Sequence, residues 1–68
     1  MKNQIEVGSK IKVATLWEYG DEDVVVEIDH AAHAIESGYI YKTAERHKDI
    51  DGHVGVWQHR DNVEMAAN

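Results

Sequence analysis

The stretch VVVEI, residues Val24–Ile28, carries the strongest β-strand signal in this chain. Its valines and isoleucine are β-branched, and such side chains fit an extended, pleated backbone better than a helix. Because the run is almost continuously apolar, it predicts a strand that is buried on both faces or packed tightly at a central position.

Upstream of this stretch, residues 10–17 (KIKVATLW) begin with polar–apolar alternation and predict a further strand. The intervening residues Tyr19–Asp23 (YGDED) predict a turn, because glycine and aspartate tolerate the backbone angles that turns require.

Downstream, the segment His30–Ser37 is open to two interpretations. Asp29 can cap a short helix that Gly38 stops, and a hairpin with a wide loop is the alternative. We favour the helical turn.

Three later segments complete the prediction: strands at Tyr39–Thr43, Val54–Gln58 and Val63–Met65, with turns at Asp51-Gly52 and over His59–Asn62. Short strands at regular spacing suggest a small barrel, which closes its own sheet edges. We therefore expect a mostly β fold: a single domain over residues 1–68, built as a four- to five-stranded antiparallel barrel with one short helical turn.

The composition restricts compartment and class. A chain of 68 residues has room for one domain, and the absence of cysteine fits a reducing cytoplasm. No apolar run approaches the roughly 18 residues that span a bilayer, and Met1–Ile5 lacks the apolar stretch of a secretion signal. We expect a cytoplasmic protein without membrane contact.

The negative charge is concentrated in one segment. The net charge is −6, and six acidic residues with no Lys or Arg among them lie in residues 18–29. Elsewhere the remaining acids are matched by Lys and Arg. Direct nucleic-acid binding requires clustered Lys and Arg, so we expect none, and a basic protein partner fits better.

Both chain ends resemble small barrels of the Src-homology-3-like kind, such as Tudor and KOW domains. Residues Val7–Val13 (VGSKIKV) are similar to the first strand of such barrels. Residues Trp57–Glu64 (WQHRDNVE) are similar to their ending, in which a one-turn helix precedes the final strand. This resemblance implies a fold and carries no site.

A second resemblance concerns Ala14–Tyr19 (ATLWEY), which is similar to the Ala-Leu-Tyr-Asp-Tyr motif of true Src-homology-3 domains. In that family such aromatics form a floor for proline-rich peptides, and acids of the following loop read a basic residue. This chain differs by the inserted Thr15, a shorter acidic loop and the absence of the paired tryptophans.

The predicted partner-binding site combines the acidic segment with nearby aromatics. Its residues are Trp17, Glu18, Tyr19, Asp21, Glu22, Asp23, Tyr39 and Tyr41. If Ile40 points into the barrel, Tyr39 and Tyr41 share the outer face. The alternatives are that the acids form an extended, solvated loop and that most of the aromatics belong to the core.

The remaining chemistry is sparse. His30 and His33 have the spacing of two ligands on one helical face, but surface histidines explain them better, so we predict no metal and no cofactor. No hydroxyl has a recognisable base beside it in sequence, so we predict no enzyme.

Three functions remain open. The first is a binding module that engages a basic partner protein through the acidic loop and aromatics. The second is an inhibitor or regulator of a nucleic-acid-handling enzyme by charge mimicry, as viral or mobile-element proteins use. The third is a homodimer or assembly component joined through Val24–Ile28, provided that this strand lies at a sheet edge.

Overall fold

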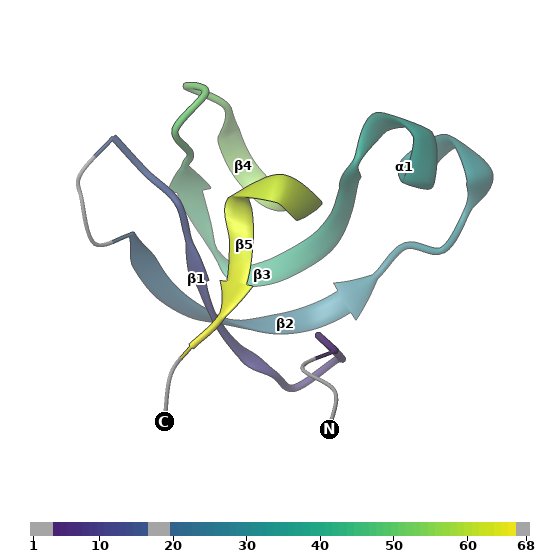
Figure 1. Cartoon of the computed structure of the whole chain (residues 1–68), viewed down its shortest axis with the longest axis horizontal. Helices are drawn as coiled ribbons and strands as arrows, with labels where there is room; N and C mark the ends of the chain where they lie inside the picture. The colour runs from purple at the N-terminus through teal and green to yellow at the C-terminus, as the bar shows by residue number, and fades with distance from the viewer. Residues whose placement is uncertain (1–3, 17–19, 67–68) are drawn as a thin grey trace.

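Five antiparallel strands form a curled half-barrel in the computed structural model of the chain, which describes residues 4–16 and 20–66 (Figure 1). The order across the sheet is β4-β3-β2-β1-β5. The strands are β1 (Lys10–Val13), β2 (Asp21–Ile28), β3 (Tyr39–Lys48), β4 (Val54–His59) and β5 (Val63–Met65). The mostly β, antiparallel fold class predicted from the sequence is confirmed.

Strand β2 lies at the centre of the curl and pairs on both sides. Its first half pairs with β1 and its second half pairs with β3, with a bulge between Val25 and Glu27. A bulge bends a strand and increases its twist, which lets β2 serve both parts of the sheet. The predicted strand and its central position are therefore confirmed.

The structure decides two points that the sequence left open for β2. Burial on both faces does not hold, because Val25 is buried whereas Val26 is 45% exposed. The strand order places β2 inside the sheet, so the condition for a homodimer through Val24–Ile28, a strand at the sheet edge, is not met. The exposure of Val26 follows from the half-barrel, which covers only one face of its central strand.

The core is small and lies on the concave face. Ile11 and Val13 alternate inward from β1 and meet Val25 of β2, and all three side chains are fully buried. Ile5, Ile28, Tyr41 and Val63 pack against them. Each buried aliphatic side chain contributes roughly 1.5–3 kcal/mol, so the fold depends strongly on these few residues.

The acidic residues Asp21, Glu22 and Asp23 begin β2 and do not form the predicted turn. They pair in register with Val13, Lys12 and Ile11 of β1. Pairing with a neighbouring strand overrides the low β propensity of aspartate, because the ladder hydrogen bonds are made by the backbone.

The segment between β2 and β3 contains a helix, α1 (Ala32–Ser37), shorter than the predicted His30–Ser37. Asp29 does not cap it; its Oδ1 accepts a hydrogen bond from the Ala31 amide at 2.9 Å, in the turn before the helix. Gly38 ends the helix with a φ of 91°, as the sequence predicts.

The last part of the chain follows the prediction closely. Strand β3 extends beyond the predicted Tyr39–Thr43, and the turn at Asp51-Gly52 follows it. The one-turn 3-10 helix η1 (Arg60–Asn62) precedes β5. The Arg60 amide and guanidinium donate hydrogen bonds to the carbonyls of Gly38 and Ile35, which hold η1 against the end of α1.

Candidate functional site

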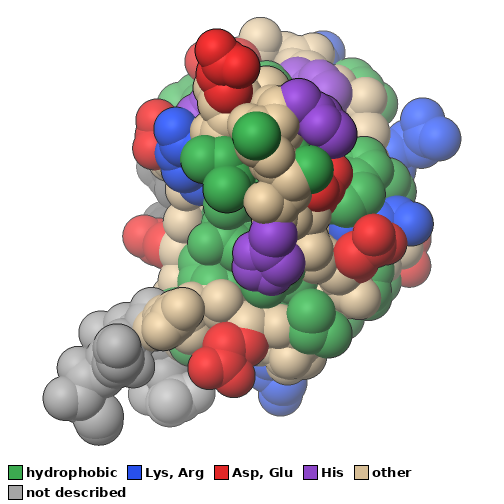
Figure 2. Space-filling view, turned by 90° about the vertical axis from the view of Figure 1, so that its right-hand side faces the viewer, with side chains coloured by type: hydrophobic (Ala, Val, Ile, Leu, Met, Phe, Trp, Pro, Cys, Tyr) green, Lys and Arg blue, Asp and Glu red, His purple; other side chains and the backbone are tan. Residues whose placement is uncertain are grey.

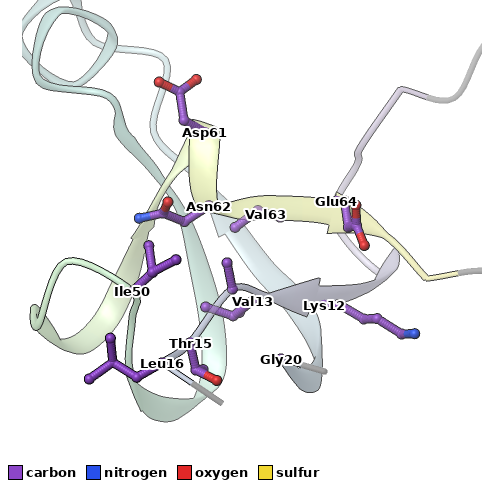
Figure 3. A pocket seen from close by; sticks show the side chains of 11 residues that line it. Lys12, Val13, Thr15, Leu16, Gly20, Ile50, Asp61, Asn62, Val63 and Glu64 are labelled. Carbon is purple, nitrogen blue, oxygen red and sulfur yellow. The ribbon is translucent and has the colours of Figure 1, made fainter. Parts of the chain in front are cut away.

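An open groove of about 480 Å³ lies between the end of β1, the β3–β4 turn and the η1–β5 segment (Figure 3). Leu16 and Ile50 lie on one side of it, and they are 64% and 49% exposed. Val13 and Val63 line the middle of the groove, between these two side chains and Lys12. Exposed aliphatic side chains that meet in a groove mark an interaction surface more often than isolated ones do.

The backbone of Ala14 joins the three segments around the groove. Its amide donates to the Asn62 carbonyl at 2.7 Å, and its carbonyl accepts from the Ile50 amide at 3.0 Å. These two hydrogen bonds fix the distance between the β1 end, the turn and η1. The groove is thus built on hydrogen-bonded backbone.

Gly20 lets the beginning of β2 approach the end of β1. Its φ is +70°, and a Cβ there would lie 2.6 Å from the Val13 carbonyl oxygen. Any other residue would force the two chain segments apart, and Gly20 and Val13 both line the groove.

The buried carboxylate of Asp49 shapes the β3–β4 turn that carries Ile50. Its Oδ1 accepts hydrogen bonds from the amides of Asp51 and His53, both at 2.9 Å. Its Oδ2 accepts from Asn62 Nδ2 at 3.4 Å, which ties the turn to η1. A fully buried carboxylate is tolerated because these donors replace its hydration.

Charged side chains at the rim of the groove are mainly acidic. Among the residues that the structure describes, Asp61 and Glu64 line it together with one cation, Lys12. Lys12 lies in register between Glu22 and Glu64, so neighbouring carboxylates offset its charge. The side chain of Asp61 is 81% exposed, and its Oδ2 lies 3.8 Å from His59 Nδ1, an imidazole that carries charge only when protonated.

Behind the groove, His47 of β3 forms a buried ion pair with two acids of β2. Its Nε2 lies 2.6 Å from Asp23 Oδ2, and its Nδ1 lies 3.1 Å from Asp21 Oδ2. The imidazole is 7% exposed, the Asp23 side chain 5% and the Asp21 side chain 52%. With a carboxylate on each ring nitrogen, the imidazole is held best when both nitrogens carry protons.

The pKa shifts at this pair reflect two opposing causes. Burial alone raises the pKa of Asp23, but hydrogen bonds from His47 and from the amides of Val24 and Glu45 outweigh it and lower the pKa. Burial alone lowers the pKa of His47, and the two carboxylates outweigh it and raise the pKa. Both groups therefore favour their charged forms.

The acidic segment does not form one surface. In register with β1, Asp21 and Asp23 lie on the face of Val13 and Ile11, whereas Glu22 lies on the opposite face with Lys12. On the face toward the right-hand side of Figure 1, shown in Figure 2, acidic side chains are interspersed with histidine and apolar ones. The expectation of a uniformly exposed acidic segment is wrong at Asp23.

The two described aromatics of the predicted site are separated as well. Tyr39 packs against the rings of His53 and His59, with centroids 4.6 and 5.1 Å away. Tyr41 packs against the core, so for this residue the core alternative holds and the conditional outward orientation does not. A register shift between Tyr39 and Tyr41 breaks the simple alternation on which that prediction depended. Trp17, Glu18 and Tyr19 lie outside the described residues.

Sequence reasoning missed three residues that the structure makes prominent: Leu16, Ile50 and His47. Ile50 is a lone aliphatic residue between two aspartates in a turn, where an apolar side chain has no local partner. That placement was the available signal for an exposed contact residue. No comparable signal marks His47, whose partners lie 24 and 26 residues away.

In residues 4–16 and 20–66, no three His, Asp or Glu side chains are grouped to hold a metal ion. In the same residues, no helix is long and apolar enough to cross a membrane.

Comparisons of the chain with protein-family models, with curated proteins and with solved structures give no match.

Proposed function

We propose that this chain is a non-enzymatic binding module whose groove holds an extended segment of a basic partner protein. The observation that carries the proposal is the pair of exposed aliphatic side chains, Leu16 and Ile50, in an open groove of about 480 Å³. An extended segment presents alternate side chains to such a groove, so an aliphatic residue can pack between these two.

The charge distribution supports a basic occupant. Asp61 and Glu64 outnumber Lys12 at the rim, and the whole chain carries a net charge of −6. Complementary charge increases the rate of encounter and selects the register of the bound segment more than it adds affinity. The aliphatic contact would supply most of the affinity.

Two further features favour binding over catalysis and support a Src-homology-3-like fold. The groups with shifted pKa, Asp23 and His47, bond each other and do not line the groove. The one-turn helix η1 precedes the last strand, as in the small barrels that the chain ends resemble. The bound segment need not be proline-rich, because Tyr41, one of the predicted aromatics, belongs to the core.

A methyl NMR titration tests this function directly. The probe is an extended peptide that alternates valine and lysine, and its control alternates valine and glutamate. We expect the lysine peptide to shift the methyl resonances of Leu16 and Ile50 saturably, and the glutamate peptide to leave them unchanged. Absence of any saturable shift with the lysine peptide would overturn the proposal.

A matched pair of variants locates the contact. Ile50→Ser should abolish the saturable binding, whereas Ile35→Ser should preserve it, because Ile35 is equally exposed but lies on α1. Charge mimicry predicts a different result: binding to polylysine that falls steeply with salt and is unaffected by Ile50→Ser. That result would mean that the protein binds basic partners through its overall negative charge and not through the groove.

A further inference from the structure

The ion pair behind the groove joins the two segments that form the groove walls. On one side, Asp21 directly follows Gly20, and Asp23 pairs with Ile11 of β1. On the other side, His47 lies three residues before Ile50 on the strand that leads into the turn. The contact His47–Asp23 therefore connects the beginning of β2, next to Gly20, to the part of β3 that leads to Ile50.

We propose that protonated His47 is a latch that holds these two walls together, so that the groove binds its basic segment in a proton-dependent way. This inference rests on the proposed function and adds its regulation. The latch is closed when the imidazole donates to Asp21 and Asp23 at once, and it opens when one of these two hydrogen bonds is lost with the proton.

The surroundings of His47 support its role as the titrating group. The carboxylates that face the imidazole are Asp21 and Asp23, both from β2. The residue opposite it on β4 is Gly55, which has no side chain to donate or accept. On its own strand, Glu45, Arg46 and Lys48 are exposed. A neutral imidazole has one donor, so it leaves one carboxylate without its partner.

The backbone around Asp23 conveys the change to β3. Asp23 Oδ2 accepts hydrogen bonds from both His47 Nε2, at 2.6 Å, and the Glu45 amide, at 3.0 Å. It thereby holds the irregular part of β3 between Lys42 and His47, where the register with β4 shifts. Loss of the proton removes one of the two imidazole hydrogen bonds from this arrangement, and the Ile50 turn then keeps its amide's bond to Ala14 and the bond between Asn62 and Asp49.

Opening the latch also removes one positive charge. This loss by itself would strengthen the attraction between the protein and a basic peptide. We expect this effect to be the smaller one, because His47 does not line the groove, whereas the latch acts on the strand that leads to Ile50. Loss of the ordered wall therefore dominates, and we expect affinity for the lysine peptide to fall as pH rises.

The first test uses the free protein and needs no peptide. The imidazole signals of His47 and the methyl signals of Leu16 and Ile50 are followed by NMR from pH 5 to 9. We expect the methyl signals to move with the midpoint of His47, whose pKa the two carboxylates raise above the ordinary histidine value. Methyl signals that do not move, or that follow His33, would overturn the latch.

The second test uses variants. His47→Gln should abolish the pH dependence of the methyl signals, and the matched exposed substitution His33→Gln should preserve it. Asp21→Asn is a milder change at a half-exposed partner, and it should move the midpoints of His47 and the methyl signals together to lower pH. If the midpoint of the methyl signals no longer equals that of His47 in Asp21→Asn, His47 does not control the groove.

The third test measures lysine-peptide affinity at pH 6 and pH 8.5, a range in which lysine stays charged. We expect binding about fivefold tighter at pH 6, a ratio that corresponds to about 1 kcal/mol. Peptide binding that is equal at both pH values would overturn the latch and leave the proposed function intact. If the methyl signals titrate with His47 but the protein binds no peptide, the proposed function is overturned and the latch remains.

Discussion

Two aspartates, Asp23 and Asp49, are both buried beside the groove but are stabilised in different ways. Asp49 is held by backbone amides of the turn and by the side-chain amide of Asn62. Asp23 accepts hydrogen bonds from the amides of Val24 and Glu45, and also from His47. Amides do not titrate, whereas an imidazole does.

This difference separates a structural carboxylate from a switchable one. The donors around Asp49 belong to consecutive turn residues and to η1, so they order a local segment whatever the pH near neutrality. The imidazole beside Asp23 comes from a different strand, 24 residues away in sequence. Its hydrogen bond therefore both joins distant segments and depends on a proton.

The largest effect is expected from Asp49→Ala. The change leaves the amides of Asp51 and His53 without an acceptor inside the turn, and an unsatisfied buried donor costs about 1–3 kcal/mol. We expect the free energy of unfolding, measured by urea denaturation, to fall by about 3 kcal/mol.

The control for Asp49→Ala is Asp51→Ala, an exposed residue of the same turn that accepts only from Asn62 Nδ2, at 3.3 Å. It should cost less than about 1 kcal/mol. Equal losses of unfolding free energy in the two variants would show that the turn does not depend on the Asp49 carboxylate as an acceptor. Asp49 would then not be the structural carboxylate of this comparison.

The second prediction concerns Asp23→Asn and its dependence on pH. The raised pKa of His47 means that the pair's contribution is full below the ordinary histidine value of 6.5 and is lost as pH rises through the folded pKa. The lowered pKa of Asp23 means that the contribution is present above 3.8 and is lost as pH falls through the folded pKa. The pair is therefore strongest between about pH 4 and 6.5.

In that window Asp23→Asn should reduce the free energy of unfolding by about 2 kcal/mol, since hydrogen bonds to charged groups contribute about 1.5–3 kcal/mol. The Asp23 and His47 side chains are 5% and 7% exposed, so solvent screening removes little of this value. Urea denaturation should show that the free energy of unfolding of Asp23→Asn differs less from that of the unmodified chain at pH 9 than at pH 6. A difference that is constant with pH would contradict the role of His47.

The fold was predictable where local pattern and strand pairing agree. Val24–Ile28 and Val63–Met65 are strands in sequence and in structure because β-branched residues there also have paired neighbours. The failures lie where distant pairing decides: Asp21–Asp23 joins β2 only because β1 is placed beside it. No local property of that acidic run predicts this pairing.

The site was less predictable than the fold, for the same reason. The acidic run suggested one surface, but strand alternation places Asp23 inward and Glu22 outward. The groove depends on Leu16 and Ile50, which are 34 positions apart in numbering and meet only after the sheet curls. A side chain's partner across such a separation is fixed by topology, and a single sequence does not reveal it.

The smallest effect is expected from Glu22→Gln, which changes the acid between Asp21 and Asp23. Glu22 lies on the outer face, where Lys12 pairs in register with both Glu22 and Glu64, so removal of one charge leaves another beside the lysine. Exposed substitutions of this kind change stability by no more than about 0.5 kcal/mol. Urea denaturation at pH 6 and pH 9 should therefore reproduce the values of the unmodified chain at both pH values. A loss as large as that of Asp23→Asn would mean that negative charge in this run, and not the inward position of Asp23 against His47, determines its contribution.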